Sequence, residues 1–452
     1  MHIDELRIQN FRCLKEVDFK FSPDNIAVII GINGAGKSSV LDSITFLLIQ
    51  LETQILKIEL IELLESNTFK QFIGKFLTVD DINYEAKQVT LSITVSTNFH
   101  KLISWSIHRT LIEKNIEGKY NQVDSYVEHL QQKLESDPEF NLPLLVYYRT
   151  RRMILDNKPI DLDNLDDLDR TIYQCKINQL NAYRGAFNPE INNFKDFFIW
   201  FRVEEDYENE IRLRQNNNYR NPKLEVIRKA IEKFLEGFPN SNFSNLRVVR
   251  TTSQRNLNFT RSPIPPSLTI TKNNQDFKLE QLSDGEKMLL MLVTDLARRL
   301  AIANPGLGVD ALQGQGIVLI DEIDLHLHPQ WQRMVIPSLT RTFPNCQFIV
   351  TTHSPQVLSK VKKENVFILE DYNLVEVTPH TYGRDSNSIL YELMDVKARP
   401  GDVQEKIDAC FALIDEEKIE EAKVKLQELA DLLGENDAEI VRARTLISFL
   451  TD

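Results

Sequence analysis

The residues with the most specific chemistry run from Gly31 to Ser38 and read Gly-Ile-Asn-Gly-Ala-Gly-Lys-Ser. They fill the G-x-x-x-x-G-K-[ST] pattern of a P-loop, whose backbone N–H groups turn inward on phosphates while the lysine reaches the β and γ oxygens. A glycine turn without a ligand is the alternative, but the strand-like run before the loop and the helix-like run after it argue against this. The predicted nucleotide-binding residues are Asn33, Gly34, Ala35, Gly36, Lys37, Ser38 and Ser39, and the Ser38 hydroxyl is also a predicted Mg²⁺ ligand.

Two carboxylates end a second apolar run, Gly316 to Glu322. The run has the form of a Walker B segment, in which Asp321 would hold the Mg²⁺ shell and Glu322 would polarise the attacking water. A buried strand that ends at an acidic loop is common, so the segment gains its meaning from the P-loop. Together the two motifs predict an enzyme that hydrolyses a nucleoside triphosphate, with Lys37 and Glu322 as catalytic residues.

A second candidate anion site precedes the helical run that starts near Met288. Ser283 and the backbone of Gly285 lie at the N-terminus of that run, where free N–H groups favour an anion. The hexad from Leu282 resembles the Leu-Ser-Gly-Gly-Gln signature of ABC ATPases, which implies that Ser283, Gly285 and Glu286 contact the nucleotide of a partner head. A role for Ser283 as helix N-cap is equally valid, and both roles can hold together.

The remaining parts of an ABC head follow in order. Thr-Thr-His-Ser-Pro after the run Gln347 to Val350 places His353 where ABC heads carry a catalytic switch histidine that contacts the γ-phosphate. His326 and His328 occupy the D-loop position; a metal could use their spacing, but a dimer-interface role is favoured. The Gln-loop residue stays open among Asp80, Asp81 and Gln88.

These residues need a sheet to hold them. Ile26 to Ile30 and the run before Asp321 are continuously apolar, as buried strands of an α/β fold are. Val89 to Ser96 and Ile103 to Thr110 alternate with period two and are predicted antiparallel strands with one solvated face. The predicted fold is α/β: an ABC/SMC-type P-loop NTPase head with a helical insertion and a C-terminal helical module.

The predicted domains are a first head lobe with the P-loop (1–115), a helical insertion that contains the strand 144–148 (116–262), a second head lobe with the signature, Walker B segment and switch histidine (263–378), and a helical module for partner or oligomer contact (379–452). The strand 144–148 leads into Arg149, Arg151 and Arg152, which are predicted to lie on an exposed loop. In the tail, Ala409, Phe411, Leu413 and Ile414 could form a core or a partner surface.

The composition is that of a globular protein, 42% hydrophobic and 26% charged, with a net charge of −13. Because the net charge is negative, we do not expect DNA to bind over a large part of the protein surface, and any contact with nucleic acid must be made by a local basic patch or by a partner. No apolar run approaches the ~20 residues that span a bilayer and no signal peptide is visible, so we expect a cytoplasmic protein without membrane contact. Cys13, Cys175, Cys346 and Cys410 show no metal-ligand spacing.

Two further motifs resemble particular groups of ATPases. Asn10-Phe11-Arg12 resembles the start of RecF/SMC-type heads, which implies a phosphate contact for Arg12. The stretch Asp-Glu-x-Asp-x-His-Leu-His-Pro resembles the OLD-like branch, although no TOPRIM nuclease segment is visible after Val377.

Two further segments are similar to PtuA, the ATPase of Septu and retron-associated anti-phage systems. They are Phe194 to Arg214, with its aromatic and acidic residues, and Tyr382-Gly383-Arg384-Asp385. In the alternative interpretation of the first segment, Trp200 and its aromatic neighbours are a core and the acidic run is a solvated face. That acidic run consists of Glu204, Glu205, Asp206 and Glu208.

The PtuA resemblance implies ATP and Mg²⁺ as ligands, a homo-oligomer built from head-to-head dimers, and a separate HNH nuclease, PtuB, as partner. The leading hypothesis is an anti-phage ATPase without nuclease activity of its own, which restrains or releases that nuclease through its nucleotide state. A sensor ATPase of a PARIS-type system with a different toxin is one alternative. The other is a RecF/SMC-like DNA-repair ATPase that binds DNA directly through a basic surface. The candidates for that surface are Arg149, Arg151, Arg152, Arg247, Arg250, Arg255 and Arg261.

Overall fold

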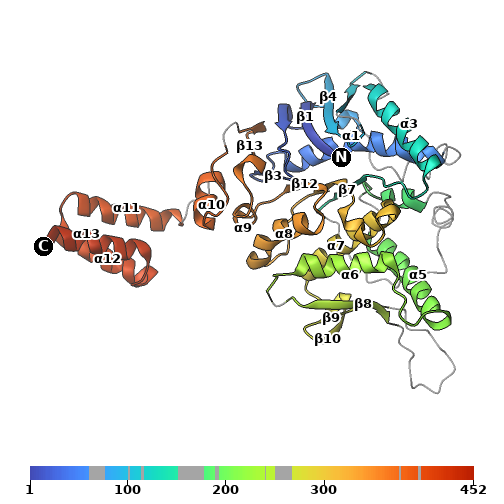
Figure 1. Ribbon diagram of the computed structural model, residues 1–452. Helices are drawn as coiled ribbons and strands as arrows, with labels where there is room; N and C mark the ends of the chain where they lie inside the picture. Colours follow the sequence, from blue (N-terminus) through green and yellow to red (C-terminus); the bar gives the residue numbers. More distant parts are fainter. Residues whose placement is uncertain are drawn as a thin grey trace, which may run out of the picture. The chain divides into compact units, whose positions relative to one another are not determined.

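The computed structural model describes residues 1–60, 77–99, 102–112, 117–150, 178–188, 193–239, 241–249, 267–375, 378–394 and 399–451 (Figure 1). They divide into two compact units, Met1–Arg384 and Asp385–Asp452, whereas the sequence places the start of the tail module at residue 379. Several residues named above lie outside the described ranges, namely Arg151, Arg152, Cys175, Arg250, Arg255 and Arg261.

A six-stranded sheet in the order β14-β13-β3-β12-β11-β7 forms the centre of the first unit. Neighbouring strands from β13 to β7 are parallel, and the short β14 pairs antiparallel at one edge. Parallel strands end at one common edge of a sheet, where α/β proteins bind their ligands. The strands are β3 (Ile26–Gly31), β7 (Leu144–Tyr148), β11 (Gly316–Ile320), β12 (Cys346–Thr351), β13 (Val366–Glu370) and β14 (Asn373–Leu374).

The sequence analysis is wrong about strand β7, which it assigns to the helical insertion. Instead of interrupting a helical insertion, it pairs in parallel with β11 and completes the main sheet. Arg149 follows it directly and is also not on an exposed loop: its guanidinium lies 2.8 Å from a carboxylate oxygen of Asp42, and 30% of its side chain is exposed. Because every side chain of β7 is buried, its sequence has no alternation that would tell which sheet it joins.

A second, antiparallel sheet in the order β2-β1-β4-β5-β6 packs on the other side of helix α1 (Lys37–Leu60). It confirms the two alternating strands, β4 (Gln88–Ser96) and β5 (Ile103–Thr110). Trp105 on β5 donates its indole N–H to the carbonyl of Leu47 in α1 at 3.0 Å. The other strands are β1 (His2–Phe11), β2 (Leu14–Lys20) and β6 (Glu117–Lys119), and α3 (Asn121–Ser136) also contacts α1.

In contrast to the sequence analysis, which found no apolar run of that length, helix α1 is the one described helix that is long and apolar enough to cross a membrane by composition. Of its apolar window, Lys37–Leu56, 78% is buried inside the protein. It touches strands of both sheets, β4 and β5 on one side and β3 and β12 on the other. Burial between two sheets accounts for its apolar composition.

The segment between β7 and the signature forms helices and a third, small sheet. The helices are α5 (Asn193–Arg214), α6 (Pro222–Leu235) and the 3-10 turn η2 (Asn178–Tyr183). Strands β8 (Phe243–Val249), β9 (Ser267–Lys272) and β10 (Gln275–Lys278) pair in the order β10-β9-β8, so this sheet crosses the boundary predicted at residue 262. The 3-10 turn η3 (Leu279–Gln281) follows it directly.

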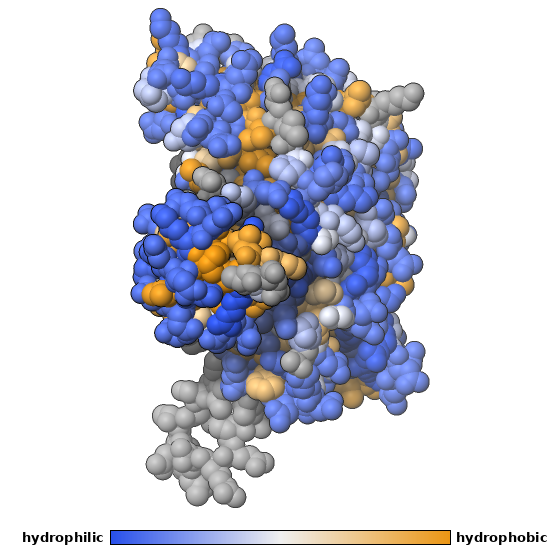
Figure 2. All heavy atoms as spheres, turned by 90° about the vertical axis from the view of Figure 1, so that its left-hand side faces the viewer, coloured by the Kyte–Doolittle hydropathy of each residue, from blue (hydrophilic) through white to orange (hydrophobic). Residues whose placement is uncertain are grey.

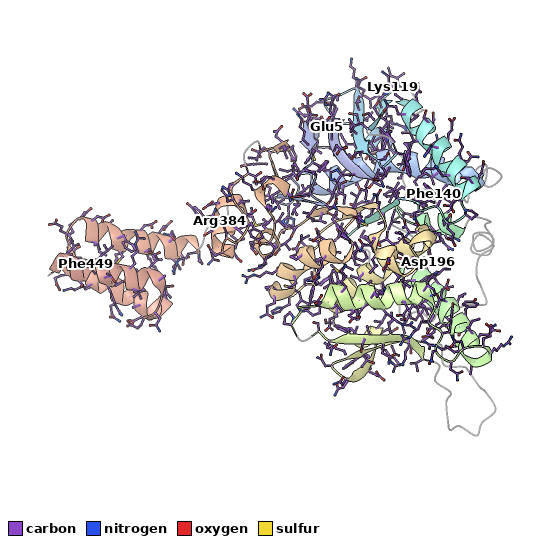
Figure 3. The ribbon with its side chains drawn as sticks, viewed as in Figure 1. Glu5, Lys119, Phe140, Asp196, Arg384 and Phe449 are labelled. Carbon is purple, nitrogen blue, oxygen red and sulfur yellow. The ribbon has the colours of Figure 1, made fainter. Side chains whose placement is uncertain are left out.

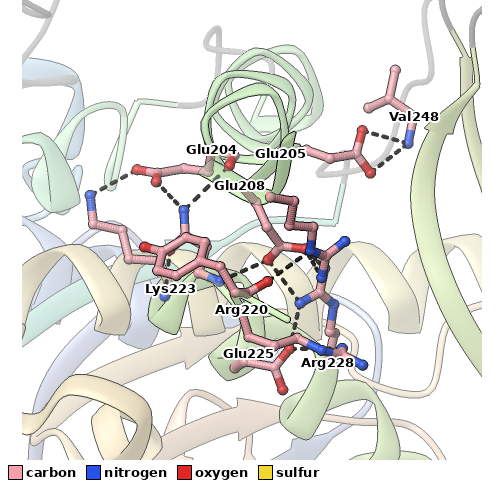
Figure 4. A network of polar contacts seen from close by, with 11 residues as sticks. Glu204, Glu205, Glu208, Arg220, Lys223, Glu225, Arg228 and Val248 are labelled. Atoms are coloured by element: carbon pink, nitrogen blue, oxygen red, sulfur yellow. Dashed lines mark hydrogen bonds and ion pairs between the residues drawn. The ribbon is translucent and has the colours of Figure 1, made fainter. Parts of the chain in front are cut away.

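The acidic run on α5 is not a solvated face. Glu208 is 1% exposed and binds Arg228 on α6 through both oxygens, at 3.0 and 3.1 Å (Figure 4). Glu205 accepts the backbone N–H of Val248 on β8. The aromatic residues before it do form a core, as the alternative predicts, with Phe197 and Phe201 fully buried. Most of the run therefore connects α5 to α6 and β8, and Asp206 is the one of the four that belongs to the exposed residues, with 48% of its side chain exposed.

Helix α7 (Asp284–Ala303) carries a buried ionic network. Asp295, 1% exposed, accepts hydrogen bonds from Arg298, from Arg299 and from the hydroxyl of Tyr148 on β7 (2.9 Å). Burial by itself would raise the pKa of Asp295, but the two guanidinium groups hold it below its usual value. The network ties α7 to the edge strand of the main sheet.

We expect Asp295→Asn to lower the free energy of unfolding by about 3–5 kcal/mol, because it leaves two buried arginines without their counter-charge. Urea unfolding followed by circular dichroism measures this difference. The matched control is Glu210→Gln, which removes the exposed pair with Arg214 on α5 and should cost less than about 1 kcal/mol. Equal stabilities of the two variants would contradict the assigned role of Asp295.

The second unit consists of α10 (Ser386–Met394), α11 (Gly401–Asp415), α12 (Ile419–Leu433) and α13 (Ala438–Thr451). Its core includes Ile414, at 2% exposure, and Phe411 and Leu413 pack partly buried against that core. Phe449 on α13 is 76% exposed, and it is labelled in Figure 3. Figure 2 faces this end of the chain and shows apolar side chains in a hydrophilic surround.

The first unit also contains the other described helical segments. They are α8 (Pro329–Thr342), α9 (Pro355–Leu358) and the 3-10 turns η1 (Val79–Asp81), η4 (Pro305–Gln313) and η5 (Lys363–Asn365).

Candidate nucleotide site

The P-loop connects the end of β3 to the start of α1. Gly31 approaches β13 so closely that a Cβ atom would lie 2.4 Å from the carbonyl oxygen of Leu369, and Gly34 and Gly36 have φ values of 85° and 103°. Only glycine adopts such conformations without strain. The Lys37 ammonium donates to the carbonyl oxygens of Gly31 (2.9 Å) and Ile32 (3.0 Å), which folds its side chain over the loop.

The Walker B carboxylate lies beside the P-loop serine. Asp321 follows β11 and is 6% exposed; its Oδ2 accepts the Ser38 hydroxyl at 3.0 Å and its Oδ1 accepts the Thr351 hydroxyl at 2.6 Å. A third hydroxyl, from Thr150 after β7, donates to Oδ2 at 3.0 Å. The structure thus brings together the two residues predicted to hold Mg²⁺.

Glu322 has a left-handed backbone, with φ of 48°, at the end of this strand. Such a conformation costs a non-glycine residue about 1–3 kcal/mol and persists where the surroundings enforce it. Here the Glu322 N–H donates to the Thr351 hydroxyl at 2.8 Å, and the N–H of Ile323 donates to the Thr351 carbonyl. Its backbone is therefore fixed by β12, the strand that leads to the switch histidine.

His353 lies near both charged motifs. Burial, and then the charge of Lys37, lower its pKa below the usual value, although Asp324, Glu322 and Asp321 oppose this. The ring is therefore neutral at neutral pH and has one N–H to donate. Asp324 fixes this segment by accepting hydrogen bonds from the Thr352 hydroxyl at 2.5 Å and from the backbone N–H of His353 at 3.3 Å.

The signature turn caps α7. The Ser283 hydroxyl and Glu286 form a reciprocal capping box, and Lys272 on β9 binds the Glu286 carboxylate. Burial would raise the pKa of Glu286, but Lys272 and Ser283 keep it below the usual value. A Cβ atom on Gly285 would lie 2.5 Å from the carbonyl oxygen of His326, so the signature glycine allows the D-loop to pack against the start of α7.

In the D-loop, His326 has a φ of 61° and the Nδ1 of His328 accepts the Gln330 N–H at the start of α8. Gln332 on α8 donates to the carbonyl oxygens of Asp324 and Leu327, which holds the loop. Among the residues that the structure describes, no group of three or more histidines, cysteines and acidic residues has the arrangement of a metal site. The His328 ring thus caps the start of α8.

Arg12 lies in the turn between β1 and β2 and is held by two carboxylates. It donates to Asp42 on α1 at 2.7 Å and to Asp81 in η1 at 2.9 Å. Asp42 lies one turn along α1 from Ser38, and its other oxygen pairs with Arg149. Arg12 is therefore positioned beside the P-loop helix with 34% of its side chain exposed, while its phosphate contact stays a prediction.

The structure also places residues that the sequence analysis did not single out. Thr150, Thr351 and Asp324 all contact the site from the ends of parallel strands or just after them. Thr351 and Asp324 stand in motifs quoted above without a role of their own, and the only sequence signal for Thr150 was its position just after an apolar run. Among the open Gln-loop candidates, Asp80 and Gln88 are exposed and Asp81 is bound to Arg12 and Thr78.

Fold and site together define a P-loop ATPase head of α/β architecture, which confirms the predicted fold class. The chain belongs to the family described as "AAA domain, putative AbiEii toxin, Type IV TA system", whose sequence model matches residues 26–359.

Several known proteins are similar to this chain. The chain is 29% identical to the retron Vc95 probable ATPase of Vibrio cholerae serotype O1 biovar El Tor over 444 residues, which cover 88% of this chain and 80% of the relative. It is 31% identical to the Septu protein PtuA of Bacillus mycoides over 180 residues, 40% of this chain and 22% of that protein. A solved SMC head bound to the C-winged helix domain of ScpA is 16% identical, with a TM-score of 0.44, and the match covers 84% of this chain and 98% of that one. The predicted resemblance to PtuA and the retron ATPases is confirmed.

Proposed function

We propose that this chain binds ATP with Mg²⁺ and hydrolyses it at a site completed by a second copy of the head. The observation that carries the proposal is the convergence of four separate segments, the P-loop, the Walker B pair, the switch histidine and the end of β7, at one edge of the main sheet. ATP binding follows from membership of the family, and the residues for hydrolysis are those assembled around Asp321.

The site fits Mg²⁺ by its donor chemistry. This cation takes oxygen ligands, and one buried carboxylate oxygen of Asp321 already receives the hydroxyls of Ser38 and Thr150. Ser38 and Asp321 would hold the ion, which would supply neutralisation of the charge on the β and γ phosphate oxygens. The Lys37 ammonium must leave the carbonyl oxygens of Gly31 and Ile32 to reach the same phosphates.

The protein's own groups supply the rest of the reaction. The Glu322 carboxylate accepts a proton from the attacking water, and its fixed backbone orients it. Neutral His353 donates its N–H to the γ-phosphate, and the backbone N–H groups of the P-loop bind the phosphate oxygens. The N-terminus of α7, with Ser283, supplies the same kind of anion site to the γ-phosphate of a facing subunit, which makes hydrolysis depend on a head-to-head dimer.

We further propose that the ATPase serves anti-phage defence in the cytoplasm and controls a separate HNH nuclease of the PtuB kind, without cutting nucleic acid itself. The support is the similarity to the retron ATPase along most of both chains and to Septu PtuA along part of each. Of the candidates for a DNA-binding surface, Arg149 and Arg247 lie in the described residues, and they are paired with Asp42 and Asp276, which does not favour the DNA-repair alternative. Nothing in the described residues favours the PARIS-type alternative.

Co-expression with an HNH nuclease encoded beside the gene tests this proposal. We expect the two proteins to elute together, and we expect ATP to change either the stability of the complex or its nuclease activity. The Lys37→Ala variant is the control, because it should bind the nuclease and not respond to ATP. Separate elution with and without ATP would exclude the partner, and salt-dependent duplex binding by the chain alone would favour the repair alternative instead.

A further inference from the structure

The end of β7 lies directly beside the Walker B carboxylate. Tyr148 pairs with Ile320 in the parallel register of β7 and β11, and the Asp321 N–H donates to the Tyr148 carbonyl at 2.9 Å. The segments that follow β7 and β11 therefore stay side by side past the end of the sheet. This brings Thr150, two residues after Tyr148, next to the side chain of Asp321.

The Thr150 hydroxyl shares one oxygen with the P-loop serine. Both donate to Oδ2 of Asp321 at 3.0 Å, while Thr351 takes Oδ1 at 2.6 Å. When Ser38 turns its hydroxyl toward a cation, Thr150 and Thr351 still hold one oxygen of the carboxylate each. Asp321 then keeps a fixed orientation, and Oδ2 can offer the ion the lone pair to which Ser38 donated before.

Thr150 is itself held in place from both sides of the strand. Tyr148 is bound to the buried Asp295 of α7, and Arg149 is paired with Asp42 of α1 and lies 4.5 Å from the centre of the Tyr147 ring. These contacts come from the signature helix and from the P-loop helix. The position of the hydroxyl is therefore set by the two helices that flank the site.

We propose that Thr150 is a positioning residue of the magnesium site, contributed by β7, and that its hydroxyl orients Asp321 toward the cation. The inference rests on the proposed binding of Mg²⁺ with ATP.

The test compares two substitutions of nearly equal size. Thr150→Val keeps the shape and loses the hydroxyl, whereas Thr150→Ser keeps the hydroxyl. The affinity for a non-hydrolysable ATP analogue is measured by calorimetry in excess EDTA and again in a titration with MgCl₂. Binding in EDTA reports on the fold and the P-loop, and the gain in affinity upon adding Mg²⁺ reports on the orientation of Asp321.

We expect unchanged binding in EDTA for both variants, and a loss of about tenfold or more of the magnesium-dependent gain in Thr150→Val alone, the size usual for residues that orient a metal ligand. Thr150→Ser should retain the gain. A full magnesium-dependent gain in Thr150→Val would overturn the inference and leave the proposed function intact. A wild-type protein that gains nothing from Mg²⁺ would overturn both, so the two failures are distinguishable.

Discussion

Glu322→Gln is expected to reduce ATP turnover by about 10²–10⁴-fold, the range that a positioned general base contributes. The amide preserves the size of the side chain and its backbone contact with Thr351, but it cannot accept the proton of the attacking water. ATP should still bind, because Lys37, Ser38 and Asp321 are untouched. Phosphate release measures turnover, and size-exclusion chromatography with light scattering measures association.

The same variant should remain associated in ATP for as long as ATP stays intact, whereas the wild type should dissociate after hydrolysis. Glu370→Gln, at the exposed end of β13, is the matched control and should behave as the wild type. Lys37→Ala alone should fail to associate with itself in ATP, since neither of its P-loops contacts the β and γ oxygens. Undiminished turnover in Glu322→Gln would remove this residue from the mechanism.

The second large effect concerns the signature turn and can be tested by mixing two inactive proteins. Ser283→Arg should abolish most turnover, by about 10²-fold or more, because the guanidinium blocks the anion site and the N-terminal N–H groups lose their ligand. Lys37→Ala should be inactive through its P-loop. In a head-to-head dimer of one Ser283→Arg and one Lys37→Ala subunit, one of the two sites has both an intact P-loop and an intact signature.

Equal mixing should therefore restore turnover to about one quarter of the wild-type value if the subunits pair at random, and to about one half if only mixed dimers form, because each mixed dimer has one complete site of two. Asn221→Ala, which removes the N-cap of α6 away from the site, controls for the loss of a helix cap and should stay active. If the signature acted within its own subunit, the mixture would be as inactive as its components. That result would contradict the dimeric site.

The parts of the site that could be predicted from sequence are the P-loop glycines and the acidic pair, because their residue types and spacing are recognisable in the sequence. Gly31, Gly34 and Gly36 are required by a close approach or a positive φ, and the acidic pair after β11 is adjacent in the chain. That the P-loop and the acidic pair lie close together could also be predicted, because the ends of parallel strands lie at one edge of the sheet.

The remaining parts depend on which strands pair. The apolar run of β7 contains nothing that distinguishes a strand of an insertion from the edge of the main sheet, and so neither the pairing of Arg149 with Asp42 nor the contact of Thr150 could be predicted. The acidic run on α5 had two equally valid interpretations. The structure shows that Glu205 and Glu208 of this run are bonded within the protein, because Asn221, Arg228 and Val248 supply their partners. These partners follow α5 in the chain, and the sequence does not show that they come close.

The hydrogen bond from Tyr148 to Asp295 has a consequence for how two subunits communicate. Tyr148, the last residue of β7, is fastened to α7, whose first turn is proposed to face the neighbour, and Thr150, two residues further on, touches the proposed metal ligand Asp321. Filling one pocket should therefore shift the affinity of the other, so that nucleotide saturation is sigmoidal in wild-type protein and becomes hyperbolic in Tyr148→Phe.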